Sequence, residues 1–263
     1  METTEMMSKY ETISTVLSII AIVLSILVPL VQWVWKKWIM TAKVNYYPTG
    51  QATLFFNQSG SYIRFNGVLE SQRKAATIKK MSLVLTRKRD DQKLKLLWSY
   101  LISPVNQNML GNYVQTMEAA HPFRVEADSV ACAFVEYSDP SDSSGKKIRK
   151  ICLDLSSSML QISQNPSYEE ALSVFSKSPE YIDAKNSLLS DFYWEIGKYT
   201  VDVSVDYDKQ KAKTFSFDFT VSEQNYTDLR NNIDESLIIK LKEYYHVPLA
   251  FSSPMVEVSE AKA

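Results

Sequence analysis

The feature that most constrains this chain is an uncharged run from Thr12 to Trp35, closed by two lysines and a cluster of tryptophans. At about 1.5 Å per residue, a helix through this run matches the roughly 30 Å hydrocarbon core of a bilayer. We therefore expect a transmembrane helix over 12–38, after a short N-terminal tail over 1–11. The interfacial anchor expected at the headgroup level comprises Trp33, Trp35, Lys36, Lys37 and Trp38.

Two other interpretations of the run compete with a retained anchor. A cleavable signal peptide carries a basic leader, a shorter apolar core and a small-x-small cleavage site. This leader instead contains Glu2, Glu5 and Glu11 against the single Lys9. A buried helix of a soluble domain is normally shorter and lacks the Trp-Val-Trp-Lys-Lys-Trp ending, so we favour the anchor.

Basic residues close to a span set its orientation in the membrane. One lysine precedes this span, whereas Lys36, Lys37 and Lys43 follow it. This bias predicts a single-pass protein of the cell membrane whose soluble region lies in the cytoplasm.

Small and polar side chains share one face of the expected helix at spacings of three and four. Such a stripe lets two membrane helices approach closely, which predicts a homo-oligomer or a second membrane protein as partner. The alternative is that the serines bond back to their own helix. The candidate packing residues are Ser14, Ser18, Ala21, Ser25 and Gln32.

The composition excludes some functions and divides the chain by charge. Six glycines, with no phosphate-binding glycine motif, argue against nucleotide-driven chemistry. Residues 1–164 contain 19 Lys and Arg against 13 Asp and Glu, whereas residues 165–263 contain 10 against 17. Either the basic part faces anionic lipid, or the two halves attract one another.

Short runs between residues 43 and 160 alternate apolar and polar side chains and are separated by turn residues. Over 77–86, for example, Met81, Leu83 and Leu85 alternate with polar neighbours at 82 and 86. This period-two pattern is typical of antiparallel sandwiches. We predict a mainly β fold with a first β-sandwich domain over 43–160, including a strand over 148–155.

A second, smaller β unit is predicted over 165–248, either as a small sandwich of its own or as part of one continuous structure with the first. Alternation over 199–207 and 215–221 predicts a hairpin whose aspartates face solvent. Before it, 194–199 resembles the G-x-Y entry to a late strand of immunoglobulin-like sandwiches, which implies that Tyr199 bonds back to the backbone. Ser167, Ser178 and Ser222 are expected to cap short helices. The segment 249–263 is predicted to be a C-terminal tail in which 255–258 can form an edge strand.

Cys132 and Cys152 flank a turn-rich stretch centred near residue 142. A hairpin there would set the two thiols opposite each other, so a disulfide is conceivable. In a reducing cytoplasm two free thiols are the expectation. Whether the two cysteines pair stays open at this point.

Groups that could perform catalysis are scarce. Only His121 and His246 could serve as the commonest general base, and neither belongs to a recognisable motif. The cysteines lack the spacing of a metal site. We therefore expect no catalytic residues, no metal and no cofactor. The candidate contact with an anionic surface, such as lipid headgroups or nucleic acid, consists of Lys79, Lys80, Arg87, Lys88 and Arg89. The alternative is that 86–92 is a hairpin tip that its charges keep soluble.

These patterns together predict a non-enzymatic, membrane-tethered β-sandwich adaptor that offers its cytoplasmic surface to a protein partner. Membrane lipid is an expected partner and nucleic acid is not. One alternative is a sensor or effector subunit of a multi-component system, such as a bacterial defence or stress system. Another is an enzyme without a recognisable motif. The layout resembles that of bacterial membrane proteins with an N-terminal span and a cytoplasmic β-domain, and this likeness indicates no particular family.

Overall fold

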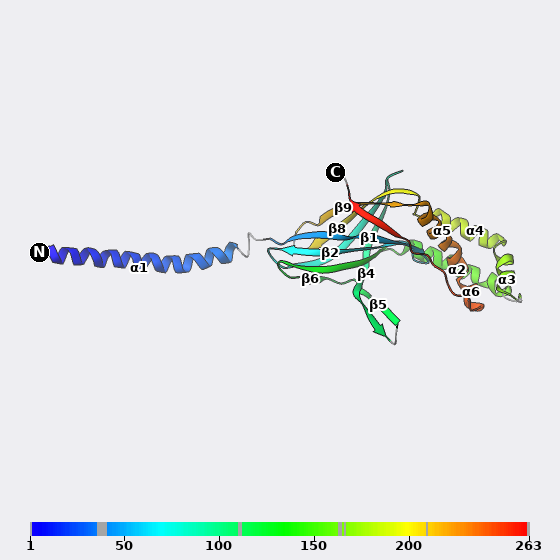
Figure 1. Cartoon of the computed structure of the whole chain (residues 1–263), viewed down its shortest axis with the longest axis horizontal. Helices are drawn as coiled ribbons and strands as arrows, with labels where there is room; N and C mark the ends of the chain where they lie inside the picture. Colours follow the sequence, from blue (N-terminus) through cyan, green and yellow to red (C-terminus); the bar gives the residue numbers. More distant parts are fainter. Residues whose placement is uncertain are drawn as a thin grey trace.

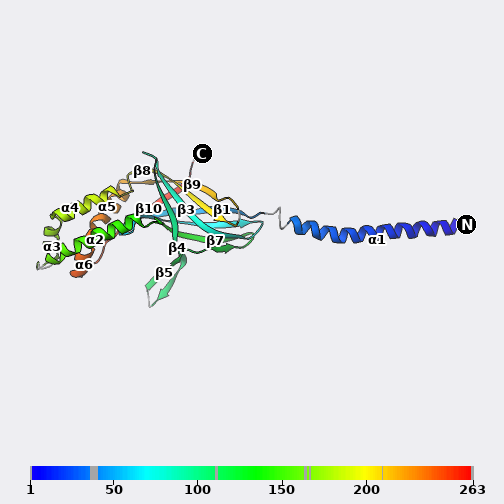
Figure 2. The same ribbon diagram turned by 180° about the vertical axis from the view of Figure 1, so that it is seen from behind.

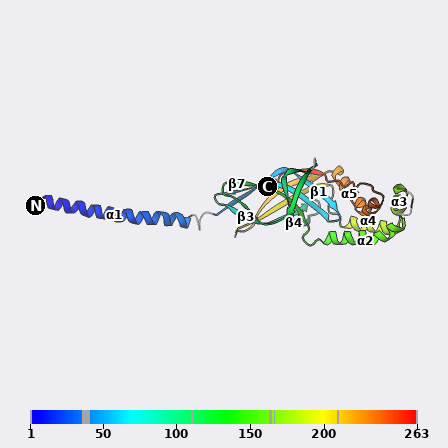
Figure 3. The same cartoon turned by 90° about the horizontal axis from the view of Figure 1, so that it is seen from below.

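The long apolar helix stands apart from the rest of the molecule. The structure is a computed structural model, and it describes residues 2–35, 41–109, 112–162, 165, 167–208 and 210–261. Helix α1, Glu2–Val34, extends away from a body that contains the strands and the other helices (Figures 1 and 3). Its segment Ser14–Val34 is the one described helix long and apolar enough to cross a membrane, and it is not buried in the protein. The helix is confirmed, and its place in a membrane stays a prediction.

The described part of the body is built on ten antiparallel strands that form one continuous sheet, in the order β5-β4-β7-β2-β1-β10-β9-β8-β3-β6. An additional pairing between β3 and β4 closes the ring, with β5 and β6 branching from it. The predicted mainly β, antiparallel fold is therefore confirmed. The strands are β1 Lys43–Asn57, β2 Gly60–Gln72, β3 Ala76–Arg87, β4 Gln92–Met109, β5 Asn112–Ala119, β6 Phe123–Val125, β7 Ser129–Ser138, β8 Gly197–Tyr207, β9 Lys213–Val221 and β10 Met255–Glu260.

The hydrophobic core fills the ring, and the period-two pattern decides which side chains enter it. In β8, Val201, Val203 and Val205 are fully buried, while the alternating Asp202 and Asp206 are partly exposed. The predicted hairpin is confirmed, because β8 pairs with β9 along its length. Tyr199 also bonds back as expected: its hydroxyl accepts a hydrogen bond from the Glu195 N–H at 2.7 Å and donates one to the Glu195 carbonyl at 3.0 Å.

Five helices in the described residues cover the end of the body that lies away from α1 (Figures 1 and 2). Ser167, Ser178 and Ser222 each accept a backbone N–H at a helix start, which confirms the three predicted caps. Such caps satisfy backbone donors that the first turn of a helix leaves without a partner. The helices are α2 Ser143–Ile162, α3 Tyr168–Phe175, α4 Pro179–Ser190, α5 Glu223–Leu237 and α6 Ile239–Tyr244.

The strand predicted over 148–155 is wrong, because this segment belongs to α2. Ile148, Cys152, Leu155 and Met159 are buried at spacings of four, three and four, which is the period of a helix face. A window of eight residues is too short to show this period. The hairpin proposed around residue 142 is also wrong, because α2 and not a strand follows this turn. Cys132 lies exposed, Cys152 lies buried in α2, and both thiols are free.

Strands from both predicted β units, and from the predicted tail, belong to the one sheet. β3 pairs with β8, and β10 lies between β1 and β9. The predicted boundary near residue 165 therefore falls between helices α2 and α3. The strands before it and the strands after it belong to the same sheet. Within the predicted tail, the strand expected over 255–258 is present as β10, but it lies inside the sheet and not at an edge. Val256 is 4% exposed and completes the core at this position.

Candidate functional site

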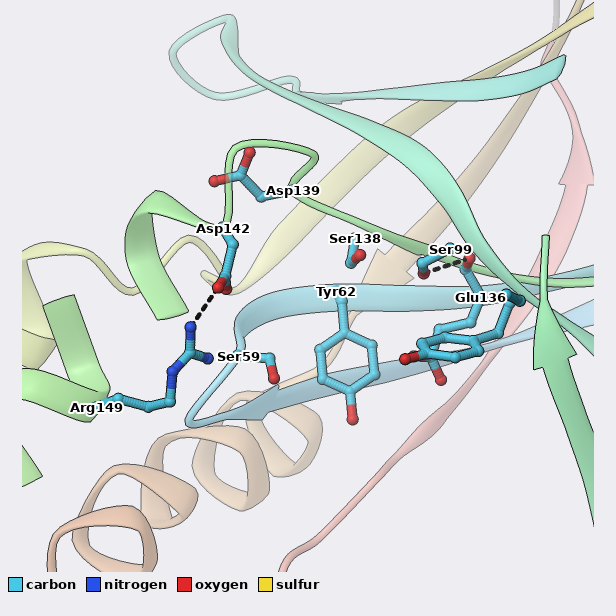
Figure 4. Close-up of a pocket in the computed structure, with 10 residues that line it drawn as sticks. Ser59, Tyr62, Ser99, Glu136, Ser138, Asp139, Asp142 and Arg149 are labelled. Carbon is cyan, nitrogen blue, oxygen red and sulfur yellow. Dashed lines mark hydrogen bonds and ion pairs between the residues drawn. The ribbon is translucent and has the colours of Figure 1, made fainter. Parts of the chain in front are cut away.

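A polar cleft of about 370 Å³ opens beside a hairpin that projects from the body. The hairpin, here called the arm, is the paired part of β4 and β5, from Tyr100↔Ala119 to Met109↔Asn112. Figures 1 and 2 both show it leaving the body at β4. The cleft lies between the base of the arm, the β1–β2 turn and the start of α2 (Figure 4). Its lining residues are Ser59, Tyr62, Ser99, Tyr100, Ala119, Glu136, Ser138, Asp139, Asp142 and Arg149.

Tyr62 forms an aromatic wall of the cleft. Its ring stacks on Phe55 with centroids 4.6 Å apart and an interplanar angle of 2°, and the Arg64 guanidinium lies 4.8 Å from the Phe55 centroid. The Tyr62 hydroxyl accepts a hydrogen bond from Asn57 Nδ2 at 3.0 Å. Burial, reinforced by the charge of Glu136, raises the pKa of Tyr62 to about 12. This hydroxyl is therefore protonated at neutral pH, so it remains able to donate a hydrogen bond.

Glu136 supplies a nearly buried carboxylate on β7. It is 9% exposed and forms an ion pair with Arg64, whose Nε lies 2.9 Å from its Oε2. The Ser99 hydroxyl donates to the Glu136 carbonyl at 3.0 Å, which ties β4 to β7 where the register between them shifts (Figure 4). A buried carboxylate such as that of Glu136 needs a positively charged partner, here Arg64, because its loss of hydration would otherwise be costly. The geometry fixes Glu136 as an acceptor at one side of the cleft.

The turn into α2 forms the opposite side. Asp139 accepts hydrogen bonds from the backbone and hydroxyl groups of Ser141 and Ser143. Burial alone would raise the pKa of the Asp139 carboxyl, but these hydrogen bonds outweigh burial and lower it. Asp142 pairs with Arg149 across the first turns of α2 (Figure 4). A Cβ at Gly145 would overlap the Asp142 carboxylate, so a larger residue there would displace the Asp142 side chain.

This arrangement can bind a polar group. Carboxylates, hydroxyls and a guanidinium offer both donors and acceptors to a ligand. A general acid requires a raised carboxyl pKa, whereas Asp139 shows a lowered one. The described residues include no cluster of three or more His, Cys, Asp and Glu side chains that could hold a metal ion. The expected absence of catalysis stays a prediction.

Sequence reasoning did not identify the cleft, because its residues come from segments that are far apart in the chain. The spacing of Ile148, Cys152, Leu155 and Met159 was the available signal for the α2 wall. No comparable local signal connects Tyr62 with Glu136, which β2 and β7 bring together by pairing.

The residues predicted to act in the membrane do not line the cleft. The described side chains of the predicted stripe are exposed on α1, where Ser18 and Ser25 donate to the carbonyls of Ser14 and Ile22 at 2.8 and 2.7 Å. These bonds correspond to the alternative in which serines bond to their own helix. Trp33 and Trp35 are exposed as well. Lys36, Lys37 and Trp38 lie outside the described residues.

The predicted basic run is divided by the fold. Arg87, with 8% of its side chain exposed, pairs with Asp90 at 2.7 Å and with Glu195 at 3.0 Å and donates to the Tyr193 carbonyl at 3.0 Å. Lys88 pairs with Asp218, and Arg89 with Glu195. The prediction that Arg87 contacts an anionic surface needs correction, because its guanidinium is packed inside the body. Three of these pairs join the basic half of the chain to the acidic half.

Replacing Arg87 is therefore expected to affect stability. Arg87→Met should lower the free energy of unfolding by about 2 kcal/mol, because it leaves the Tyr193 carbonyl without its buried donor and leaves Glu195 with the exposed Arg89 as its partner. Lys88→Met is the matched control and should cost less than about 1 kcal/mol, since Lys88 is well exposed. Urea unfolding of the detergent-solubilised chain measures both. Equal losses in the two variants would contradict the assignment.

Comparisons with known proteins provide little additional information. No protein-family model and no curated protein matches the chain. Among solved structures, the sporulation control protein Spo0M from Bacillus subtilis matches with 10% identity and a TM-score of 0.26, over 67% of this chain and 47% of its own. A family 123 glycoside hydrolase from Clostridium perfringens matches with 9% identity and a TM-score of 0.28, over 67% of this chain and 26% of its own. Likenesses this weak support no conclusion about activity or ligands.

Proposed function

We propose that this protein is a membrane-tethered, non-enzymatic interaction protein whose body binds a protein partner at the arm and the adjoining cleft. In this proposal α1 spans the cell membrane once, and the body lies in the cytoplasm. An immunoglobulin-like relationship of the body is part of the proposal and is supported by the Tyr199 corner.

The exposure of α1 supports the tether. Ser14–Val34 contains 21 residues, about 31 Å of helix, which is close to the thickness of the hydrocarbon core. The core helix of a soluble protein would bury its apolar side chains against the body, whereas these side chains are exposed all round. Exposing these apolar side chains to water is unfavourable, and transferring them into lipid lowers their free energy.

The arm is the observation that carries the interaction proposal. Among the described strands, β5 pairs with β4 alone, so its other edge is open to a further strand. Isolated two-stranded hairpins are marginally stable in water, and exposed edges readily pair with another chain. An extended segment of a partner can add to β5 by strand addition. Met117 and Tyr100 are exposed at the base of the arm and would contribute apolar contacts.

The cleft would supply specificity to this contact. A partner strand running along β5 would pass the opening at Tyr100 and Ala119. Its polar side chains could then reach the acceptor Glu136 on one side and the Asp142–Arg149 pair on the other. Backbone pairing provides affinity in such complexes, while pockets select side chains.

The alternative function, a sensor or effector subunit, is favoured by the course of β1. This strand starts at Lys43, nine residues after the end of α1, and finishes at Asn57, beside the cleft residue Ser59. Asn57 contacts both Ser59 and Tyr62 by hydrogen bonds. A ligand that displaced Tyr62 would therefore act on a strand that continues towards the membrane helix.

Site-specific crosslinking tests the interaction proposal. A photoreactive residue in place of Thr116, an exposed position on β5, should yield a discrete crosslinked species in intact cells. The same residue in place of Val174 is the control, because Val174 is exposed on α3 at the far end of the body. A species of twice the chain mass would identify a second copy as the partner. If Thr116 yields no adduct, or both positions yield the same diffuse adducts, the arm is not the binding element.

A further inference from the structure

Five basic side chains gather at the end of the body where β1 begins. Lys43 opens β1, and Arg73 and Lys74 lie in the turn between β2 and β3. Lys43 and this turn are neighbours, because Lys43 pairs with Gln72 in the sheet. All five side chains are exposed, and none belongs to an ion pair among the described residues. This set, here called the basal surface, is Lys43, Arg73, Lys74, Lys79 and Lys80.

A β-bulge exposes two consecutive lysines on this surface. The register between β3 and β8 shifts between Ile78 and Lys80, and both Lys79 and Lys80 face solvent. Regular alternation would turn one of them into the core, where an unpaired ammonium is costly. Met81 resumes the pattern and is fully buried. Bulges re-aim side chains in this manner, and here the result is two adjacent exposed positive charges.

The acidic groups at this end of the body hold the backbone and neighbouring side chains in place. Asp128 accepts the Arg73 N–H at 2.9 Å, and Asp208 accepts the Thr77 N–H at 3.0 Å. Glu70 accepts hydrogen bonds from Asn45, Tyr47 and Gln72. These carboxylates stabilise the turns and the strand ends. Asp206 lies opposite Lys80 in the β3–β8 register, and the hydrogen bonds to Glu70, helped by the charge of Lys43, lower the pKa of that carboxyl. Among the described residues, none of these carboxylates forms an ion pair with a basal side chain.

The other end of β3 shows the opposite arrangement. Arg87, Lys88 and Arg89 are all paired with carboxylates, and they lie about 30 Å along the strand from Lys79. Of the residues considered for an anionic contact, the two lysines nearest the tether are thus the unpaired ones. Charge that is not neutralised within the body is available to a partner.

The tether keeps the basal surface near the membrane. Eight residues, 35–42, separate the end of α1 from β1. Even fully extended, eight residues reach only about 28 Å. The anionic lipid of a cytoplasmic leaflet attracts Lys and Arg within about a Debye length, roughly 8 Å at physiological salt. The short connection therefore keeps the start of β1 within about 28 Å of the end of α1, so the basal charges can reach the lipid headgroups.

We propose that the basal surface binds the headgroups of anionic phospholipids in the membrane that α1 spans, and that this contact orients the body. The inference rests on the proposed tether. It adds a specific lipid chemistry and a consequence: with its base held against the membrane, the body presents the arm and cleft in a defined direction.

Amine labelling of the full chain in lipid nanodiscs tests this proposal. Acetylation of Lys74, Lys79 and Lys80, followed by mass spectrometry, should be at least about threefold slower in discs with about one-third phosphatidylserine than in pure phosphatidylcholine. The difference should disappear near 0.5 M salt, where the Debye length is only a few ångströms. Lys150 and Lys177, exposed in the helical part of the body, are internal controls that should react equally in both discs.

A matched pair of variants separates lipid binding from a general charge effect. Lys74→Gln, Lys79→Gln and Lys80→Gln together should remove the lipid-dependent protection of the remaining Lys43. The control changes Lys93, Lys95 and Lys150 to Gln, three exposed lysines outside the basal surface, and should preserve that protection. Equal labelling in both lipids, with the chain embedded in the discs, would overturn this inference alone. Failure of the chain to enter discs would overturn the tether itself.

Discussion

Placing two arginines in the middle of α1 is expected to release the protein from the membrane fraction. Val23 and Leu27 lie near the centre of Ser14–Val34 and share one helix face. Each Arg at the centre of a span costs about 3 kcal/mol on insertion scales, whereas each Val or Leu there contributes about −0.3 to −0.6 kcal/mol. The combined change of about 7 kcal/mol opposes the insertion that the apolar run favours.

The measurement is the distribution of full-length protein between pellet and supernatant after ultracentrifugation of lysed cells without detergent. The chain as it stands should pellet and should require detergent for release. The matched control, Val23→Leu with Leu27→Val, keeps the apolar character and should pellet equally. A parent chain that stays in the supernatant would refute the tether. A mature protein that begins after residue 35 would identify the run as a cleaved signal.

Substituting Gly67 by alanine is expected to cost about 3 kcal/mol of folding free energy, at the upper end of the usual range for overpacking a core. Gly67 lies in β2 opposite Pro48, and a Cβ at this position would overlap the Tyr46 ring. Tyr46 is 4% exposed and packs against Phe65, Phe215 and Phe217, with centroids about 6 Å away. The ring therefore has nowhere to move without displacing other aromatic side chains.

Urea unfolding of the solubilised chain measures this cost, and a double-mutant cycle identifies its cause. In a Tyr46→Ala background the overlapping ring is absent, so Gly67→Ala should cost less than about 1 kcal/mol. The difference between the two backgrounds is the energy of the overlap. An equal cost with and without the ring would show that backbone effects, and not the contact with Tyr46, make glycine necessary.

Neighbouring residues determined the features that were predictable. The serine caps at 167, 178 and 222 bond to N–H groups three residues away, so a short stretch of sequence contains the whole interaction. The β8–β9 hairpin follows from alternation and one polar turn. The α2 segment was predicted incorrectly because a run such as Ile-Arg-Lys-Ile-Cys-Leu, read over a few residues, fits both periods.

The candidate sites depended on contacts between distant residues. Tyr62 and Glu136 lie in the same cleft because β2 pairs with β7, and their separation in the sequence does not predict this pairing. Arg87 belongs to the predicted basic run, yet Glu195 and Tyr193, more than 100 residues later, make it a buried structural residue. The bulge that exposes Lys79 and Lys80 together is a property of the pairing with β8.

By itself, the sequence determined the long apolar helix, the antiparallel β character and the helix caps, because each depends on local periodicity or on groups a few residues apart. Only the tertiary structure decided that the strands form one ring, that β10 lies inside the sheet, and which basic side chains are paired. The physical reason is that strand pairing and burial join groups far apart in the chain, and their partners become defined only when the core closes.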